Sequence, residues 1–152
     1  MSDGSFSDVM RLAIDEARRA IDHDDVPIGA LVLGPDGSAV ALDHNRREEL
    51  NDPTAHAEIL ALRAAANTLG DYRLGGTTLY VTLEPCPMCA AARVHARVAR
   101  LVFGAWDPRQ GAAGSVFNLV TARAMNHQVD CFGGVLADEC GTLLKRFFES
   151  RR

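Results

Sequence analysis

Three residues in two separate stretches of the chain have the types and the spacing of ligands for a metal ion. His56 lies in the first stretch, and Cys86 and Cys89 lie in the second, directly after Pro85. One imidazole and two thiolates are three zinc ligands, which leave one position of a tetrahedral ion open to water. A water bound to zinc becomes a nucleophile near neutral pH, so this pattern predicts catalysis rather than a closed structural site.

Glu58 follows the histidine by two residues and is the predicted catalytic residue. A carboxylate next to the metal can move protons to and from the attacking water. A Cys-x-x-Cys pair alone would also fit thiol redox chemistry. The full order, His-x-Glu followed by Pro-Cys-x-x-Cys, is instead typical of zinc-dependent nucleobase deaminases. The motif therefore predicts hydrolytic removal of an amino group.

The other two cysteines, Cys131 and Cys140, allow one alternative. Either could complete a structural zinc site with four protein ligands, but such a site would leave Glu58 without a role. A reducing cytosol keeps thiols free, so we expect both cysteines to pack in the interior instead. The remaining histidines have no partner ligands at a suitable spacing and are assigned no role: His23, His44, His95 and His127.

Length and composition fit one globular domain over residues 1–152. The chain is 47% hydrophobic and 24% charged, and it contains no apolar run of the roughly 20 residues that cross a bilayer. The N-terminal residues lack the pattern of a secretory signal, so a cytoplasmic location is expected. The net charge of -4 excludes a strongly basic nucleic-acid binder. Local clusters of arginine and lysine can still bind phosphates.

Two predicted helices begin at the candidate ligands. Thr54 can cap a helix over 55–69, which puts His56 in its first turn. Pro87 suits the first turn of a helix over 87–95, where unpaired amides and the helix dipole favour anionic thiolates. Two helix starts are thus expected to converge on one metal ion.

The rest of the chain alternates predicted strands and helices, which indicates an α/β fold. A loop is expected over 45–53, between the second strand and the first of the two ligand helices. The other expected elements are an amphipathic helix over 5–23, strands over 28–33, 38–43, 77–83, 100–104 and 129–132, and a closing helix over 136–149.

Several further stretches match a known family. They are 26–30, Asn45, 52–59, 79–86, 103–105, 111–115, 125–127, 134–140 and 147–148. On these stretches the chain resembles the bacterial tRNA adenosine deaminases of the TadA type, within the cytidine deaminase-like zinc deaminases. The segment after Phe103 distinguishes this resemblance from one to guanine deaminases, in which the residues around the zinc look nearly identical.

The resemblance implies a three-layer αβα fold with a central mixed five-stranded sheet. It also implies one zinc ion per subunit, a homodimer, and conversion of adenosine to inosine at the wobble position of a tRNA anticodon stem-loop. The alternative is a deaminase of a free nucleobase or nucleoside, such as guanine, cytosine or cytidine.

Three substrate-binding residues follow from the resemblance. It implies that Asn45 hydrogen-bonds the target base, that Asp107 contacts the anticodon loop, and that Phe148 lies near the bound RNA. From residue type alone, Asn45 could be a turn residue, Asp107 a loop cap, and Phe147 or Phe148 part of the core.

Trp106 departs from the family pattern, because a basic residue is common at its position. An indole could stack on a base, whereas the positive charge is lost. The phosphate contacts would then come from other basic residues near the expected RNA face: Arg109, Lys145, Arg146, Arg151 and Arg152.

Overall fold

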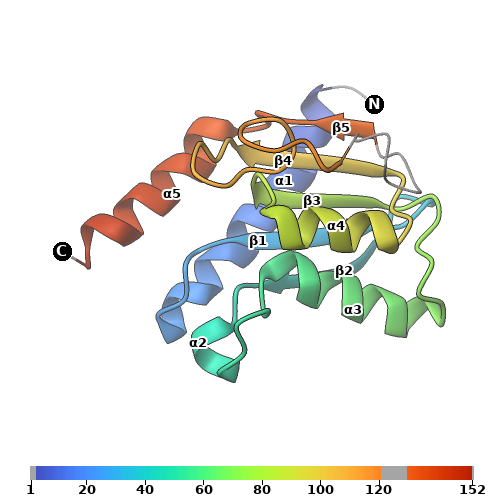
Figure 1. Ribbon diagram of the computed structural model, residues 1–152, viewed down its shortest axis with the longest axis horizontal. Helices are drawn as coiled ribbons and strands as arrows, with labels where there is room; N and C mark the ends of the chain where they lie inside the picture. Colours follow the sequence, from blue (N-terminus) through green and yellow to red (C-terminus); the bar gives the residue numbers. More distant parts are fainter. Residues whose placement is uncertain (1–2, 121–129, 152) are drawn as a thin grey trace.

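The computed structural model describes residues 3–120 and 130–151, and it has a five-stranded sheet between two layers of helices (Figure 1). The strand order is β2-β1-β3-β4-β5. Strand β1 pairs antiparallel with β2 and β3, whereas β4 pairs parallel with β3 and β5. The expected mixed five-stranded sheet is therefore confirmed. The strands are β1 Gly29–Leu33, β2 Ala39–His44, β3 Thr78–Leu83, β4 Arg100–Ala105 and β5 Asp130–Phe132.

Helices cover both faces of this sheet, which gives the expected three layers (Figure 1). Helices α3 (Ala57–Leu69) and α4 (Pro87–His95) lie on one face. Helices α1 (Asp3–Arg18) and α5 (Ala137–Glu149) lie on the other. The two short helices, η1 and α2, span Arg19–His23 and Arg47–Leu50. Among the described residues, no helix is both long and apolar enough to cross a bilayer.

Alternation along the central strand β3 divides the interior into two cores. Leu79 and Val81 pack in the core beneath α3 and α4, whereas Tyr80 packs in the core beneath α1 and α5. Successive side chains of a strand point to opposite faces, so a strand between two helical layers is apolar at every position. Because β3 and β4 are parallel, the segments that follow them leave the sheet at the same edge.

Three expectations on local structure need correction, and some others fall on residues that the structure does not describe. The predicted cap Thr54 does not begin α3, because its amide and hydroxyl both donate to Asp52 and the helix starts at Ala57. The loop expected over 45–53 contains helix α2. The first helix becomes a 3-10 helix from Arg19 onward. The matching stretch 125–127, the first residue of the strand expected over 129–132, and Arg152 lie outside the described residues.

Gly29 lets α1 pack directly on β1, which yields a test of this interface. A Cβ atom at Gly29 would lie 2.0 Å from the carbonyl oxygen of Ala13 and 2.7 Å from the amide nitrogen of Ala17. We expect Gly29→Ala to lower the free energy of unfolding by about 1 to 3 kcal/mol, because the helix backbone must move. Urea denaturation measures this change.

Gly141→Ala is the matched control, because nothing lies within 4 Å of a Cβ built at that helical position. This variant should keep or increase the free energy of unfolding, by up to about 1 kcal/mol. Equal stability of Gly29→Ala and the wild type would contradict the packing described here.

Candidate active site

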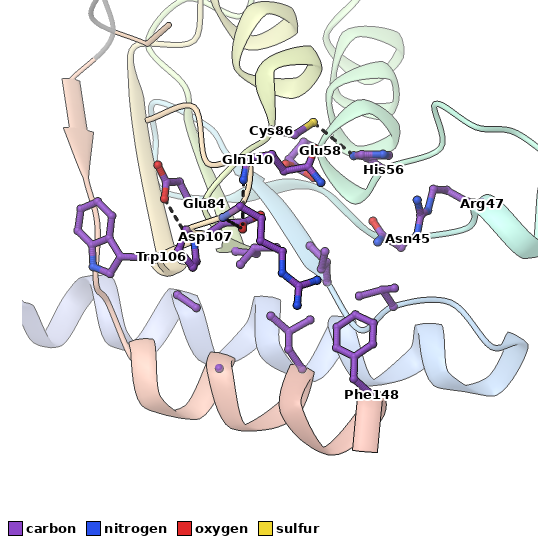
Figure 2. A pocket seen from close by; sticks show the side chains of 18 residues that line it. Asn45, Arg47, His56, Glu58, Glu84, Cys86, Trp106, Asp107, Gln110 and Phe148 are labelled. Carbon is purple, nitrogen blue, oxygen red and sulfur yellow. Dashed lines mark hydrogen bonds between the residues drawn. The ribbon is translucent and has the colours of Figure 1, made fainter. Parts of the chain in front are cut away.

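The starts of α3 and α4 place two of the candidate ligands opposite each other. His56 and Cys86 are the extended residues immediately before the two helices, with ψ angles of 150° and 172°. Figure 2 shows their side chains facing each other across one pocket. Neither side chain caps its own helix, so both remain available to a ligand.

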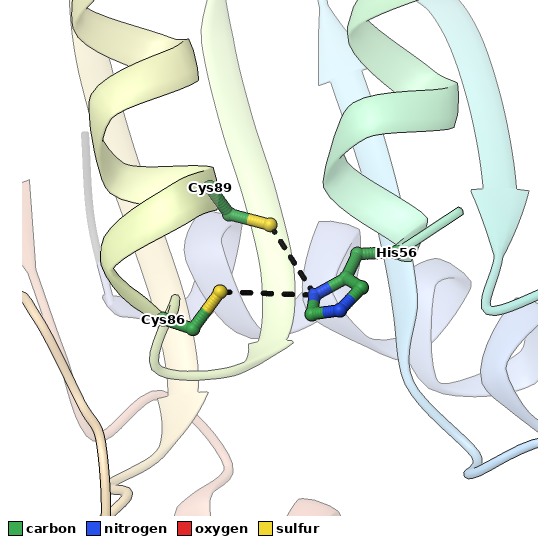
Figure 3. A group of neighbouring side chains, drawn as sticks. All are labelled: His56, Cys86 and Cys89. Atoms are coloured by element: carbon green, nitrogen blue, oxygen red, sulfur yellow. Dashed lines mark hydrogen bonds between the residues drawn. The ribbon is translucent and has the colours of Figure 1, made fainter. Parts of the chain in front are cut away.

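The three predicted metal ligands have the spacing that a tetrahedral ion needs. Nδ1 of His56 lies 3.7 Å from Sγ of Cys86 and 3.5 Å from Sγ of Cys89 (Figure 3). The three ligand atoms all lie within 4.8 Å of one another. Zinc bonds of about 2.0 Å to nitrogen and 2.3 Å to sulfur, at a tetrahedral angle, separate the two atoms by about 3.5 Å. The donor set and its geometry therefore fit zinc.

Protons are unevenly distributed over this cluster. Hydrogen bonds from Cys89 and His56 lower the pKa of Cys86 to about 4, despite its partial burial. The same thiolate raises the pKa of Cys89, and burial adds to that shift. It also raises the pKa of His56. Without metal the site thus holds the thiolate of Cys86, the thiol of Cys89 keeps its proton at neutral pH, and the raised pKa of His56 favours its protonated form.

Glu58, the predicted catalytic residue, lies in the first turn of α3 and is only 4% exposed. Burial raises the pKa of its carboxyl group, whereas the charges of His56 and Arg93 oppose that shift. It lines the same pocket as His56 and Cys86 (Figure 2). A buried carboxyl group with raised proton affinity is suited to accept and return a proton.

The pocket has a volume of about 410 Å³ and is walled by segments that are distant in the sequence. Such a volume lies in the range of small-molecule sites. The lining residues include the loop after β2, the end of β3, the loop after β4, and one side of α5: Val26, Ile28, Asn45, Arg47, His56, Glu58, Leu83, Glu84, Cys86, Ala105, Trp106, Asp107, Pro108, Arg109, Gln110, Gly141, Leu144 and Phe148.

Asn45 lines the pocket and also stabilises the start of α3. Its side-chain Oδ1 accepts a hydrogen bond of 2.8 Å from the backbone N–H of Ala57, the first residue of that helix. The residue is 2% exposed. Because Oδ1 is engaged, the amide nitrogen is the end of this side chain that can donate to a molecule in the pocket.

Asp107 and Phe148 also line the pocket, from the loop after β4 and from α5. Oδ1 of Asp107 accepts hydrogen bonds from the backbone N–H groups of Arg109, at 2.9 Å, and Gln110, at 3.4 Å, as expected of a loop cap. Phe148 is 50% exposed, whereas the neighbouring Phe147 is buried in the protein and contacts it edge to face. Only one of the two rings therefore belongs to the interior.

Trp106 and five basic residues were expected to contact RNA, but they do not all lie at the pocket. Trp106 lines the pocket, is half exposed, and packs its ring edge to face on Phe103. Arg109 lines the pocket, together with Arg47, which the sequence did not suggest. Arg151 instead pairs with Asp24.

Glu84 is a site residue that sequence reasoning missed. Its buried carboxylate accepts backbone hydrogen bonds from Asp107 at 2.9 Å and from Ala113 and Ser115 at 3.0 Å, and the hydroxyl of Ser115 also donates to it. These bonds overcome the effect of burial and lower the pKa of Glu84. Gly111 leaves room for the carboxylate, since a Cβ there would lie 2.3 Å from Oε1. The carboxylate thus holds the loop that forms one wall of the pocket.

Arg93 is a second residue whose position the sequence did not indicate. It lies in α4, is fully buried, and none of its three guanidinium nitrogens has a hydrogen-bond partner among the described residues. Burial lowers its pKa to about 10, while the charges of Glu58, Cys131 and Cys89 oppose that shift. A buried positive charge therefore acts on the carboxyl group of Glu58.

Cys131 and Cys140, the alternative fourth ligands, lie outside the cluster. Cys140 is 1% exposed and packs in the core beneath α1 and α5. Cys131 packs against the opposite core. Neither belongs to a group of potential metal ligands among the described residues. Cys140 therefore has the interior position expected of it, and Cys131 is partly buried against the core.

Comparisons with known proteins agree with this site. Residues 5–105 match the family model of the cytidine and deoxycytidylate deaminase zinc-binding region. The tRNA-specific adenosine deaminase of Bacillus subtilis is 49% identical over 94% of this chain and 88% of its own length. The corresponding protein of Agrobacterium fabrum is 48% identical over 94% of this chain and 93% of its own length.

Solved structures share the fold as well. One comes from work on A-to-I editing by deaminases at the wobble position of transfer RNA. It superimposes with a TM-score of 0.85 and 47% identity, covering 89% of this chain and 97% of that one. A guanine deaminase from Nitrosomonas europaea gives a TM-score of 0.75 and 26% identity, covering 91% of this chain and 81% of that one.

The proton distribution predicts how zinc affinity depends on pH. The raised pKa of Cys89 means that zinc must displace its proton at neutral pH, and the raised pKa of His56 adds a second proton to displace as the pH falls, whereas Cys86 has none to lose. We expect the affinity to increase by about tenfold per pH unit for each displaced proton. Competition with a chelator between about pH 6 and pH 8 measures it, and a constant affinity would contradict the assigned protonation.

Glu84→Gln tests whether this carboxylate holds the pocket wall. A glutamine amide group would face backbone N–H donors with one acceptor fewer, so we expect the free energy of unfolding to fall by about 1 to 3 kcal/mol. The pKa of Glu84 in the folded protein lies below its ordinary value of 4.5. The stability difference between the wild type and Glu84→Gln should therefore be present at neutral pH, and it should shrink as the pH falls below 4.5 through the pKa of the folded protein.

Glu139→Gln is the matched control, because Glu139 forms an exposed ion pair with Arg11. Such a pair contributes at most about 1 kcal/mol. If Glu84→Gln cost no more stability than this control, the wall would not depend on the buried carboxylate.

Proposed function

Because the chain belongs to the tRNA-specific adenosine deaminases, within the family that shares the cytidine and deoxycytidylate deaminase zinc-binding region, we propose that it converts the wobble adenosine of a tRNA anticodon to inosine. One observation supports this reaction above all: His56 and Cys86 of the cluster with Cys89 line a single pocket together with the buried carboxyl group of Glu58. The enzyme is a zinc-dependent hydrolase.

We assign His56, Cys86 and Cys89 as the zinc ligands. When bound there, zinc acts as a Lewis acid that lowers the pKa of water and so favours attack on the base. The histidine is neutral as a ligand and the two thiolates balance the charge of the ion. The three residues thus leave one position for a reactant, and together with the ion they would add no net charge to the pocket.

Glu58 is assigned the proton transfers. It accepts a proton from the attacking water and delivers it to N1 of adenine as the bond to C6 forms. A second proton transfer lets the amino group leave C6 as ammonia, so adenosine and water give inosine and ammonia. Its burial in the first turn of α3, beside His56, supports this role.

Asn45, Asp107 and Phe148 are assigned to substrate binding. The amide nitrogen of Asn45 can donate to the base, since its oxygen is held by Ala57. The half-exposed rings of Phe148 and Trp106 offer surfaces on which neighbouring bases can stack. Asp107 is assigned to the anticodon loop through the pocket wall that it shapes.

A single-stranded loop is the substrate that this pocket can use. The amino group of a stacked and paired adenine is not accessible to a buried carboxyl group. A loop nucleotide is extruded at low cost, and Arg47 and Arg109 at the pocket can contact the adjacent phosphates.

We further propose that residues 1–152 act as one deaminase domain, that two copies form a homodimer, and that the protein works in the cytoplasm. Support for the first comes from relatives that match over nearly all of this chain and most of their own length. The homodimer is inferred from the family resemblance, and the cytoplasmic location is inferred from the tRNA substrate.

An activity assay with parallel substrates tests the reaction. The zinc-loaded protein is incubated with an anticodon stem-loop carrying wobble adenosine, and separately with guanine, cytosine and cytidine. We expect inosine from the stem-loop only, and a stem-loop with adenosine at another loop position is the matched control. Turnover of guanine without RNA would favour the activity of the Nitrosomonas europaea protein of similar fold. Inactivity on all substrates would contradict a deaminase.

Glu58→Gln tests the assigned proton transfers. The amide has nearly the same shape but cannot accept the proton, so kcat on the stem-loop should fall by about 100-fold to 10,000-fold. Zinc content should stay unchanged, as measured by elemental analysis of the same sample. Glu149→Gln, an exposed carboxylate in α5, is the control and should keep full activity. Wild-type turnover by Glu58→Gln would contradict the mechanism.

A further inference from the structure

A second cluster of metal-binding residue types lies outside the pocket. His23 ends helix η1, His44 ends strand β2, and Glu49 lies in helix α2. Nε2 of His23 lies 3.1 Å from Nε2 of His44 and 2.8 Å from Oε2 of Glu49. The three ligand atoms all lie within 4.8 Å of one another, as in the cluster of the active site. Two imidazoles and a carboxylate are thus gathered at the spacing of ligands around one ion.

The hydrogen bonds on the opposite ring nitrogens determine which nitrogens carry protons. Nδ1 of His44 lies 2.6 Å from Oε2 of Glu16, and Nδ1 of His23 lies 2.9 Å from Oδ2 of Asp25. An ionised carboxylate only accepts, so each Nδ1 must donate a hydrogen. In neutral rings both Nε2 atoms then carry lone pairs, and these face each other at 3.1 Å. A positive charge satisfies this contact, either as a metal ion bound by both rings and Glu49 or as a proton on Nε2 of His23, which lies 2.8 Å from Oε2 of Glu49.

The outer carboxylates are themselves fixed in place. Asp25 is 1% exposed and accepts backbone hydrogen bonds from Glu48 at 3.1 Å and Glu49 at 3.4 Å, at the start of α2. Glu16 is 6% exposed. Metal-binding histidines commonly donate their other N–H to a carboxylate or carbonyl oxygen, which fixes the tautomer and the orientation of the ring. Both histidines here have that arrangement.

The cluster is electrostatically suited to a cation and is accessible to one. Three carboxylates, those of Glu16, Asp25 and Glu49, surround two imidazoles, and the other oxygen of Glu49 is paired with Arg46 at 2.9 Å. The side chains of His23 and Glu49 are 21% and 35% exposed. An ion can therefore enter from solvent and reach the more deeply buried ring of His44.

We propose that His23, His44 and Glu49 bind a second divalent transition-metal ion of the zinc type, with Asp25 and Glu16 as outer hydrogen-bond partners. Two imidazole nitrogens and one carboxylate oxygen suit zinc, cobalt and similar ions better than calcium or magnesium, which prefer oxygen ligands. The ion joins η1, the end of β2 and α2. Asn45, which follows His44 directly, is thereby held at its place in the pocket. The ion itself takes no part in the reaction.

Cobalt titration distinguishes the two sites, because only the active site contains sulfur. The metal-free full-length protein is titrated with Co²⁺ and followed by absorption. We expect two ions per chain, one producing intense thiolate-to-metal charge-transfer bands and one producing ligand-field bands alone. Uptake of a single ion per chain, with the two rings sharing a proton instead, would overturn the proposal.

His23→Gln and Glu49→Gln test the assigned ligands. His23→Gln should reduce cobalt uptake from two ions to one per chain and leave the charge-transfer bands unchanged, while Glu49→Gln should weaken the second ion by at least tenfold. His95→Gln, which changes an exposed histidine in α4, is the matched control and should still bind two ions.

Circular dichroism verifies that each variant is folded. If His23→Gln bound a second cobalt ion with the affinity of the wild type, the assignment of His23 as a ligand would be overturned. Deaminase activity is not a readout of this experiment, so its result is independent of the proposed function.

Discussion

The meeting of two helix starts at one point is the constraint on which the rest of this structure depends. A tetrahedral ion accepts ligands only at a fixed spacing, and here the ligands come from chain segments 30 residues apart, His56 and Cys86. Both precede the first helical residue, where unpaired amides and the helix dipole favour a thiolate. The sheet achieves this meeting because β3 ends where α4 must begin, and α3 packs beside α4 on the same face.

Buried polar side chains then shape the pocket around that point. Asn45 satisfies the first amide of α3 and so links the ligand helix to the loop after β2. Glu84 has the same effect on the opposite wall, because its carboxylate gathers backbone amides of the loop after β4. A buried carboxylate without hydrogen bonds would lower the free energy of unfolding, so the loop after β4 must keep its amides in contact with Glu84. Asn45 and Glu84 therefore hold the two walls of the pocket in place around the candidate zinc ligands.

The features that follow from motif spacing and from local residue patterns were predicted correctly from the sequence. The grouping of His56, Cys86 and Cys89 followed from motif spacing, and the start of α4 followed from Pro87. Most strands were predicted within one or two residues, because β3 is apolar and turn residues separate β1 from its antiparallel neighbour β2.

Residues that act through distant contacts escaped prediction. Thr54 looked like a helix cap, but Asn45 supplies the hydrogen bond from twelve residues away. Glu84 resembled any acidic residue after a strand, and its partners lie beyond β4. His23 and His44 have no regular spacing, and only the packing of η1 against the end of β2 brings their rings together. Tertiary structure, not local pattern, creates each of these contacts.

X-ray absorption spectroscopy at the zinc edge, on protein loaded with one zinc ion per chain, tests the central claim most directly. The predicted coordination has two sulfur ligands at about 2.3 Å and two lighter ligands at about 2.0 Å, one of them the imidazole of His56. That result would establish a metal held by the two helix starts with one position free for reaction. Three or four sulfur ligands would mean that Cys131 or Cys140 completes a closed site, and would contradict the account.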